Sequence, residues 1–287
     1  MEVLNFADDT LLYIKIPPDS TNIENHINSE LAKVNKWVKE NHLKLNASKT
    51  NYLVFSQKSN KLNNILNNIK LVINNTTPIK RTQNCKYLGI TIDEKLTWKP
   101  HIEKLIAKLS KAVGILYRVR RYLNKHTLNL LLHSLVFSHI KYGIVCYART
   151  INKYLKPLII IINRAIRCIN FKRRWDQKTS TLYKEQKVLQ FNDLYNLELG
   201  KFCFKFHNNL LPQAFRNIFT KTSSTHPYNT RNSNISFHRS NKKNKSGFTT
   251  INAIGAKLWN KLPNEIRNEK ELHTFTDKYK NHILQTY

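Results

Sequence analysis

The sequence begins with two short apolar segments on either side of a tight Ala-Asp-Asp centre, within the stretch Asn5 to Ile16. This pattern predicts a β-hairpin whose turn holds the carboxylates of Asp8 and Asp9 at the tip. Adjacent carboxylates repel each other unless a cation lies between them, and Mg²⁺ prefers carboxylate and phosphate oxygens as ligands. The pair therefore indicates either a magnesium site or an ordinary solvated turn, and the dipeptide alone does not separate the two.

The residues after the hairpin predict one helix and several short strands. Thr21 and Glu24 are spaced as a capping box, and apolar residues then recur at helical spacing up to about Asn41. Strands are expected at residues 52–55, at residues 70–73 and, with Gly89 allowing a bulge, at residues 85–93. The first hundred residues thus predict a mixed α+β region.

From Trp98 the pattern becomes helical and the charge becomes one-sided. Pro100 suits the first turn of a helix, and apolar residues from Ile102 to Leu116 form its buried stripe. Between Lys104 and Trp175 the sequence contains no Asp or Glu, although a solvated surface normally mixes both signs. With a formal net charge of +30 for the whole chain, this favours a polyanionic partner, and nucleic acid is the first candidate.

The remaining sequence predicts further helices, at residues 128–136, 154–169, 176–209, 251–259 and 265–284. The aromatic residues Phe202, Phe204 and Phe206 are expected in their core. Residues 220–246 are rich in Ser, Thr, Asn and Lys with almost nothing to bury, and they predict a mobile basic loop.

Several classes of protein are disfavoured. The four cysteines are widely spaced with no Cys-x-x-Cys pair, which argues against a zinc site and a disulfide framework. The longest aliphatic run, residues 158–162, is far shorter than the ~20 residues of a membrane-spanning helix, and the N-terminus does not resemble a signal peptide. We therefore expect an intracellular protein without a membrane partner, in the nucleus or the cytoplasm.

Four motifs give the chain a family resemblance. They are Phe6-Ala7-Asp8-Asp9, then Leu43-Lys44-Leu45-Asn46-Ala47-Ser48-Lys49-Thr50, then Lys86-Tyr87-Leu88-Gly89 with Leu96-Thr97-Trp98, and finally Trp259-Asn260-Lys261-Leu262-Pro263. In this order and spacing the chain resembles the reverse transcriptases of non-LTR (LINE-type, jockey-like) retrotransposons. The resemblance covers nearly the whole chain and starts at the metal-binding hairpin of that family, so we expect a C-terminal half truncated upstream of it.

The resemblance implies an α+β fold. Residues 1–97 would be a partial palm of hairpins plus a helix, carrying motifs C, D and E. Residues 98–175 would be a mostly α-helical thumb, and residues 176–287 a helical C-terminal region with the basic loop at about 220–246.

The resemblance also implies roles for individual residues. Asp8, assisted by Asp9, would bind catalytic Mg²⁺ ions, which in polymerases lie ~3.5–4 Å apart and clamp the attacking and leaving oxygens. Lys49 would protonate the leaving pyrophosphate, although a lysine there can also act as a point charge. Residues 86–89 would form the primer grip, although they can equally be an ordinary core hairpin.

The nucleic-acid partner would be an RNA template, a DNA primer or an RNA–DNA duplex, and the sequence leaves any protein partner open. Tyr117 and Tyr122 could stack on bases, but core packing suits them equally well. The residues predicted to contact nucleic acid are Lys86, Tyr87, Leu88, Gly89, Lys104, Lys108, Lys111, Arg118, Arg121, Lys172, Arg173 and Arg174.

Three hypotheses about function remain from the sequence. The first is a fragment of an RNA-directed DNA polymerase that binds primer-template but does not polymerise alone, because the fingers and the family's upstream catalytic Asp are not in the sequence. The second is a non-catalytic basic nucleic-acid-binding protein derived from such an element. The third is a basic structural protein in which the Asp-Asp turn is a coincidence.

Overall fold

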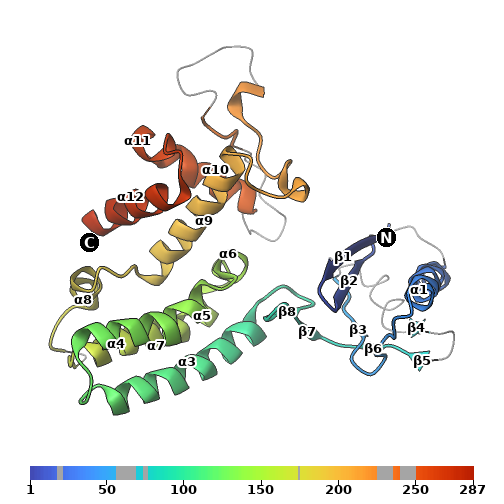
Figure 1. Ribbon diagram of the computed structural model, residues 1–287, viewed down its shortest axis with the longest axis horizontal. Coiled ribbons are helices and arrows are strands. Elements are labelled where there is room, and N and C mark those ends of the chain that lie inside the picture. Colours follow the sequence, from blue (N-terminus) through green and yellow to red (C-terminus); the bar gives the residue numbers. More distant parts are fainter. Residues whose placement is uncertain (18–21, 56–68, 74–76, 174, 225–234, 240–249) are drawn as a thin grey trace. The chain divides into compact units, whose positions relative to one another are not determined.

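The computed structural model forms two compact units, Met1–His101 and Ile102–Tyr287 (Figure 1). It describes residues 1–17, 22–55, 69–73, 77–173, 175–224, 235–239 and 250–287. The predicted boundary between a thumb (98–175) and a C-terminal region (176–287) falls inside the second unit and stays a prediction.

The first unit contains one long helix and four two-stranded sheets within its described residues. β1–β2, β4–β5 and β7–β8 are antiparallel pairs, whereas β3 and β6 pair in parallel. The elements are β1 (Glu2–Phe6), β2 (Asp9–Tyr13), α1 (Ile23–Glu40), β3 (Asn51–Tyr52), β4 (Val72–Ile73), β5 (Thr77–Pro78), β6 (Lys80–Arg81), β7 (Asn84–Tyr87) and β8 (Ile90–Asp93). The strand predicted at residues 52–55 is thus shorter than expected, because only its first residue is paired.

A small apolar core joins α1 to the strands. Its buried members are Ile23, Ile27, Ile69, Leu71, Ile73 and Ile79. Asn28 fixes the contact, because its side chain donates to the carbonyl of Lys70 and accepts from the amide of Val72, each over 3.1 Å. Burying α1 against β4 therefore also satisfies backbone groups of the segment that leads into that strand.

The predicted capping box of Thr21 and Glu24 includes a residue outside the described part and stays a prediction. Thr21 lies outside the described residues, and Asn22 precedes α1 in a left-handed conformation without a side-chain cap. Glu24 accepts a hydrogen bond of 3.2 Å from the amide of Lys70. Glu24 thus links the first turn of α1 to a segment that is distant in the sequence.

The second hairpin, β7–β8, is joined to the start of α3 (Lys99–Val119) by Asp93. Its turn is Leu88-Gly89, with φ of 44° and 81°, which is the conformation that favours glycine at the second position. The carboxylate of Asp93, nearly buried, accepts from the amide and hydroxyl of Thr97 and from the amide of Trp98, over 2.8–2.9 Å. The residues predicted as one strand with a possible bulge are therefore a tight hairpin followed by a fixed turn.

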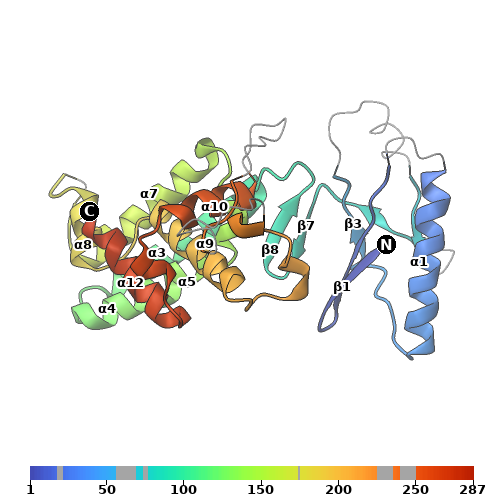
Figure 2. The same ribbon diagram turned by 90° about the horizontal axis from the view of Figure 1, so that it is seen from above.

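The second unit is helical, and the predicted helices are confirmed. α4 and α7 lie side by side, and α9 packs along α10 and α12 (Figures 1 and 2). The elements are α4 (Lys125–Leu132), η1 (His133–Phe137), α5 (Ser138–Lys141), α6 (Ile144–Tyr147), α7 (Asn152–Ile169), α8 (Thr179–Glu185), α9 (Phe191–His207), η2 (Gln213–Phe215), η3 (Thr222–Ser224), α10 (Ile251–Lys261), α11 (Asn264–Arg267) and α12 (Leu272–Gln285), together with α3 from Ile102 onward.

An aromatic cluster holds α9, α10 and α12 together. The rings of Phe204 and Phe275 lie 4.8 Å apart between centroids, and Trp259 stacks on Phe237 at 5.5 Å. These four side chains are almost completely buried. Of the aromatic residues predicted to be core, Phe204 is buried, whereas Phe202 and Phe206 are half-buried at the edge of the cluster.

Phe237 corrects the expectation of a loop with almost nothing to bury at residues 220–246. It is 1% exposed, its amide donates to the Asn260 side chain over 2.9 Å, and its carbonyl accepts from the same amide group over 2.7 Å. Residues 225–234 and 240–249 of this segment lie outside the described part. Phe237, together with a hydrogen bond from Trp259 Nε1 to the carbonyl of Ile235, docks residues 235–239 on α10.

A π-helical turn interrupts the helix that runs from α4 into α5. At His133–Phe137 the amide of Ser138 donates to the carbonyl of His133, five residues earlier. The buried side chains Leu128, Leu132, Val136 and Ile140 recur at every fourth position through this turn. An α-helix rotates such a series off its face by about 40° per step, and the wider π turn removes part of that drift.

The glycines of the second unit make a testable contrast. A Cβ at Gly200 on α9 would lie 2.6 Å from the buried ring of Tyr279, whereas a Cβ at Gly114 on α3 would meet nothing within 4 Å. We expect Gly200→Ala to lower the free energy of unfolding by about 1–3 kcal/mol, because the ring must move. Gly114→Ala should raise it by up to about 1 kcal/mol through helix propensity. Urea unfolding followed by circular dichroism measures both, and equal effects of the two substitutions would contradict this packing.

Candidate nucleic-acid interface

The predicted hairpin of the two aspartates forms, with Ala7 and Asp8 as its two-residue turn. Phe6 pairs with Asp9, and Ala7 has a φ of 51°. Asp8 and Asp9 are both exposed, and so are most residues of the two strands, including Phe6 with 62% of its surface accessible. The turn therefore presents two neighbouring carboxylates to solvent, as the sequence predicts, but on a hairpin with little cover.

Two carboxylates supply only some of the six ligands of a magnesium ion. Mg²⁺ demands octahedral oxygen coordination and combines one or two carboxylates with waters and substrate phosphates. In the described part of the chain, no group of three or more His, Cys, Asp or Glu side chains is arranged so that it could hold a metal ion. Asp8 and Asp9 could contribute to a metal site, but the described residues do not complete one.

Lys49, the other predicted catalytic residue, lies in a turn organised by Asn46. The Asn46 carbonyl accepts from the amides of Lys49 and Thr50, each over 3.1 Å, and its side chain accepts from the hydroxyl of Ser48 over 2.6 Å. Lys49 is exposed. The turn holds the backbone of the lysine in place, and its catalytic role stays a prediction.

The predicted primer-grip residues occupy the turn region of the β7–β8 hairpin. Lys86 and Gly89 are exposed, whereas Tyr87 and Leu88 are half-buried. This arrangement fits either a nucleic-acid contact or an ordinary core hairpin, so the two interpretations stay open.

α3 presents the predicted basic face. Lys104, Lys108, Lys111 and Arg118 are all exposed, while Ile102, Leu105, Leu109, Val113 and Leu116 are buried. At 3.6 residues per turn the four basic residues fall within roughly 80° of arc. The helix thus separates its charge from its core contacts, which is the geometry that a phosphate-binding surface requires.

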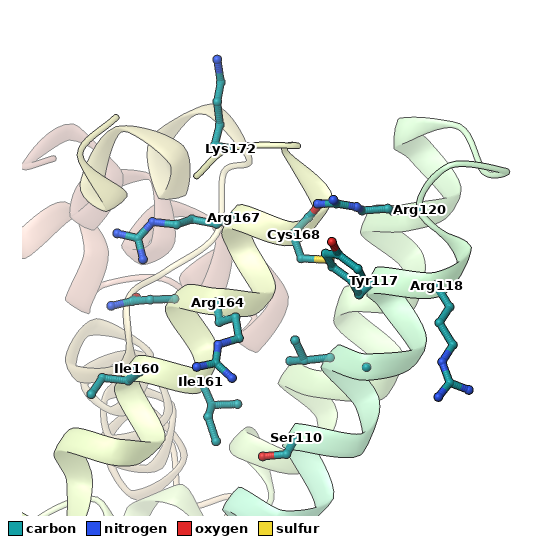
Figure 3. A pocket seen from close by; sticks show the side chains of 13 residues that line it. Ser110, Tyr117, Arg118, Arg120, Ile160, Ile161, Arg164, Arg167, Cys168 and Lys172 are labelled. Atoms are coloured by element: carbon teal, nitrogen blue, oxygen red, sulfur yellow. The ribbon is translucent and has the colours of Figure 1, made fainter. Parts of the chain in front are cut away.

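A basic groove lies between α3 and α7 (Figure 3). It has a volume of about 850 Å³, and its basic lining residues are Arg118, Arg120, Arg164, Arg167 and Lys172. Lys172 and Arg118 were predicted to contact nucleic acid, whereas Arg120, Arg164 and Arg167 were not. Their spacing of three residues, in Tyr117/Arg120 and in Arg164/Arg167, was the available signal, because such residues share one helix face.

Arg120 forms the centre of an aromatic–arginine stack at one end of this groove. Its guanidinium carbon lies 4.2 Å from the ring centroid of Tyr117 and 5.2 Å from that of Phe171, and its Nη1 donates to the carbonyl of Cys168 over 3.4 Å. Tyr117 and Phe171 are nevertheless 59% and 56% exposed. Of the two predicted interpretations of Tyr117, core packing is therefore wrong.

The other predicted basic residues differ in their surroundings. Arg121 is exposed, and so is Arg173, whose amide donates to the carboxylate of Asp176 over 2.6 Å. Tyr122 is exposed, so core packing is wrong for it too. Arg174 lies outside the described residues.

Burial and the nearby positive charge of the second unit together lower the pKa of two of its histidines. Burial lowers the pKa of His139, and the positive charge of Lys108 lowers it further. Burial and then Lys141 and Lys280 lower the pKa of His133 in the same way. These imidazoles are therefore harder to protonate in the folded protein, because each added proton would meet a positive field.

Comparison with known proteins gives one relative. Over 178 residues, 61% of this chain, the sequence is 22% identical to the probable RNA-directed DNA polymerase from transposon X-element of Drosophila melanogaster. The chain is distantly similar to a retrotransposon reverse transcriptase. The match covers 18% of the length of that polymerase, so the chain corresponds to a small part of it.

The likeness supports the predicted relationship to non-LTR retrotransposon reverse transcriptases and, in general terms, a nucleic-acid partner. No family model and no solved structure matches the chain. None of the described helices is both long and apolar enough to span a bilayer.

His207 gives a pH-dependent prediction. Its pKa is lowered from 6.5 by burial, then by Lys221 and Arg267. Below pH 6.5 the unfolded chain therefore binds more protons at this position than the folded chain, so stability should fall as the pH drops from 7.5 to 5.5. Urea midpoints at the two pH values should differ less in His207→Gln than in the wild type. The exposed His126→Gln serves as the control, and an unchanged pH dependence in His207→Gln would contradict the assignment.

Proposed function

We propose that this chain is derived from a retrotransposon reverse transcriptase and binds primer-template nucleic acid through the basic face of α3. The observation that carries the proposal is the separation on α3 of exposed Lys104, Lys108, Lys111 and Arg118 from a buried apolar stripe. Such a face can neutralise successive phosphates, and each neutralised phosphate releases condensed counterions. In this proposal residues 1–97 are a palm remnant and residues 98–175 a thumb.

Two further observations support this proposal. The chain is distantly similar to an RNA-directed DNA polymerase. The segment from Lys104 to Trp175 contains no acidic residue that would repel phosphates. The first favours nucleic acid over an anionic membrane, and the second suits either polyanion.

We propose that the chain, by itself, does not polymerise nucleotides. Asp8 and Asp9 offer carboxylates on one turn, and the described residues bring no third acid beside them. Bound Mg²⁺ ions would supply activation of a primer hydroxyl and charge neutralisation at the triphosphate. The two aspartates would have to share that task with carboxylates from elsewhere, and Lys49 would serve as a cation near the leaving group.

A second candidate function is a non-catalytic nucleic-acid-binding protein derived from such an element. The exposed, sparsely covered hairpin of Asp8 and Asp9 favours it, because catalytic groups require a surrounding structure that fixes their geometry. Both candidates share the binding surface on α3 and differ only in whether a completed metal site exists.

The salt dependence of binding tests the α3 surface. Replacing Lys104, Lys108 and Lys111 by Gln should weaken binding to an RNA–DNA duplex. The slope of log K against log salt should fall by about 0.9 for each lost phosphate contact. The matched control replaces Lys33, Lys36 and Lys39, three exposed lysines of α1, by Gln. Fluorescence anisotropy measures both, and equal losses would show that net charge, rather than this face, governs binding.

Primer extension tests the catalytic half of the proposal. The wild-type chain should incorporate no deoxynucleotide on a primed RNA template in Mg²⁺, and Asp8→Ala should behave identically. Duplex affinity of Asp8→Ala should equal that of the wild type. Mg²⁺-dependent incorporation that Asp8→Ala abolishes would overturn the proposal of inactivity and establish a complete metal site.

A further inference from the structure

The groove between α3 and α7 has the size of a small-ligand site. Its volume of about 850 Å³ lies within the ~300–1,000 Å³ of such pockets. A nucleic-acid duplex, whose major groove alone is about 12 Å wide, does not fit inside such a volume. The groove therefore suits a smaller ligand than the exposed basic face of α3, which can lie against a duplex.

The groove combines an apolar floor with positive charge. Val113, Ile160 and Ile161 contribute apolar surface, and five of the 13 residues that line it are Arg or Lys. None of these lining residues is Asp or Glu. Arginine binds phosphate bidentately and also stacks on planar rings, so this lining suits a ligand that carries both phosphate and base.

The aromatic–arginine stack adds planar surfaces at one end of the groove. Tyr117 and Phe171 lie on Arg120 and still expose more than half of their surface. Proteins that bind single strands combine a positive groove with aromatic rings on which bases stack. Here Tyr117 and Arg120 belong both to the stack and to the groove lining.

Gly114 is an independent observation. It lies in the middle of α3 and lines the groove, where glycine costs about 1 kcal/mol relative to alanine. Internal packing accounts for Gly200 and Gly255, because added Cβ atoms would lie 2.6 and 2.7 Å from aromatic rings. At Gly114 an added Cβ would meet nothing within 4 Å. The absence of a side chain keeps the groove open, rather than serving a contact within the described chain.

We infer that the groove between α3 and α7 binds an unpaired segment of nucleic acid, with a phosphate on Arg164 and a base on the exposed ring of Tyr117. The inference rests on the proposed function, since it assigns a single-stranded ligand to the same basic unit. An acidic amphipathic helix of a partner protein is the competing occupant. The exposed rings flanking Arg120 favour the nucleic acid, because a base has planar faces that match them.

The experiment compares single-stranded and duplex probes on the full chain. A fluorescein-labelled 12-nucleotide oligouridylate and a blunt RNA–DNA duplex of the same length are titrated at one salt concentration, and anisotropy gives both affinities. Gly114→Leu places a side chain in the groove on a residue with good helix propensity. It should weaken oligouridylate binding at least about tenfold and change duplex binding less than about twofold. Thermal unfolding confirms that the variant is folded.

Tyr117 provides the second arm. Tyr117→Ala should weaken oligouridylate binding about 5- to 150-fold, the range for loss of one base–aromatic stack. Tyr117→Phe, which keeps the ring, should bind the oligouridylate with the affinity of the wild type. Arg164→Gln should reduce the salt dependence of oligouridylate binding but not that of duplex binding.

The outcomes separate the two proposals. If the wild type binds neither probe, the proposed function itself fails. If the wild type binds both probes but Gly114→Leu and Tyr117→Ala leave oligouridylate affinity unchanged, the inference about the groove is overturned alone. It is also overturned if an acidic amphipathic peptide binds the wild type, loses affinity with Gly114→Leu, and the oligouridylate does not.

Discussion

Repulsion between like charges is the constraint under which the helical unit folds. The segment from Lys104 to Trp175 contains no Asp or Glu, and burial and then the charge of Lys141 lower the pKa of Lys280. The ion pairs of Lys201 with Glu198 and of Lys278 with Glu269 lie in the C-terminal part of this unit. Cohesion of the basic part must therefore come from apolar burial, which contributes roughly 25 cal/mol per Å². The fully buried leucines of α3 and α4 supply that surface, and a polyanion would relieve the remaining repulsion.

The sequence predicted those features that depend on short-range patterns. The stripe from Ile102 to Leu116 specified α3, and Ala7-Asp8 between two apolar segments specified the first hairpin, because both signals lie within a few residues. The contact of Glu24 with the amide of Lys70 was not predicted, since this partner is 46 residues away. Phe237 was missed for a similar reason: a single aromatic residue has no periodicity, and only the fold brings Asn260 and Trp259 to it.

The residues of the candidate site could likewise be predicted only where a short-range pattern specifies them. Asp8, Asp9 and the lysines of α3 could be named from motifs and helical spacing. The groove could not, because Arg120 meets Phe171 only when the ends of α3 and α7 come together. The exposure of the first hairpin could not be predicted from the sequence either. The segments of the first hairpin are apolar, yet Leu4 and Phe6 are both exposed. The basic helical surface thus lies on a packed core, whereas the acidic turn lies on an exposed hairpin.

The π-helical turn at His133–Phe137 affects how this chain can be compared with others. Through it the helix accommodates more residues per turn than α-helical geometry allows, while Leu132 and Ile140 remain on the buried side. A relative with an uninterrupted α-helix here would need one residue fewer to bury the equivalent side chains. An alignment that carries regular helical periodicity across the turn would then assign the positions after Phe137 to the wrong structural equivalents. At low sequence identity, an alignment of two distant relatives would first pair the wrong residues in this segment.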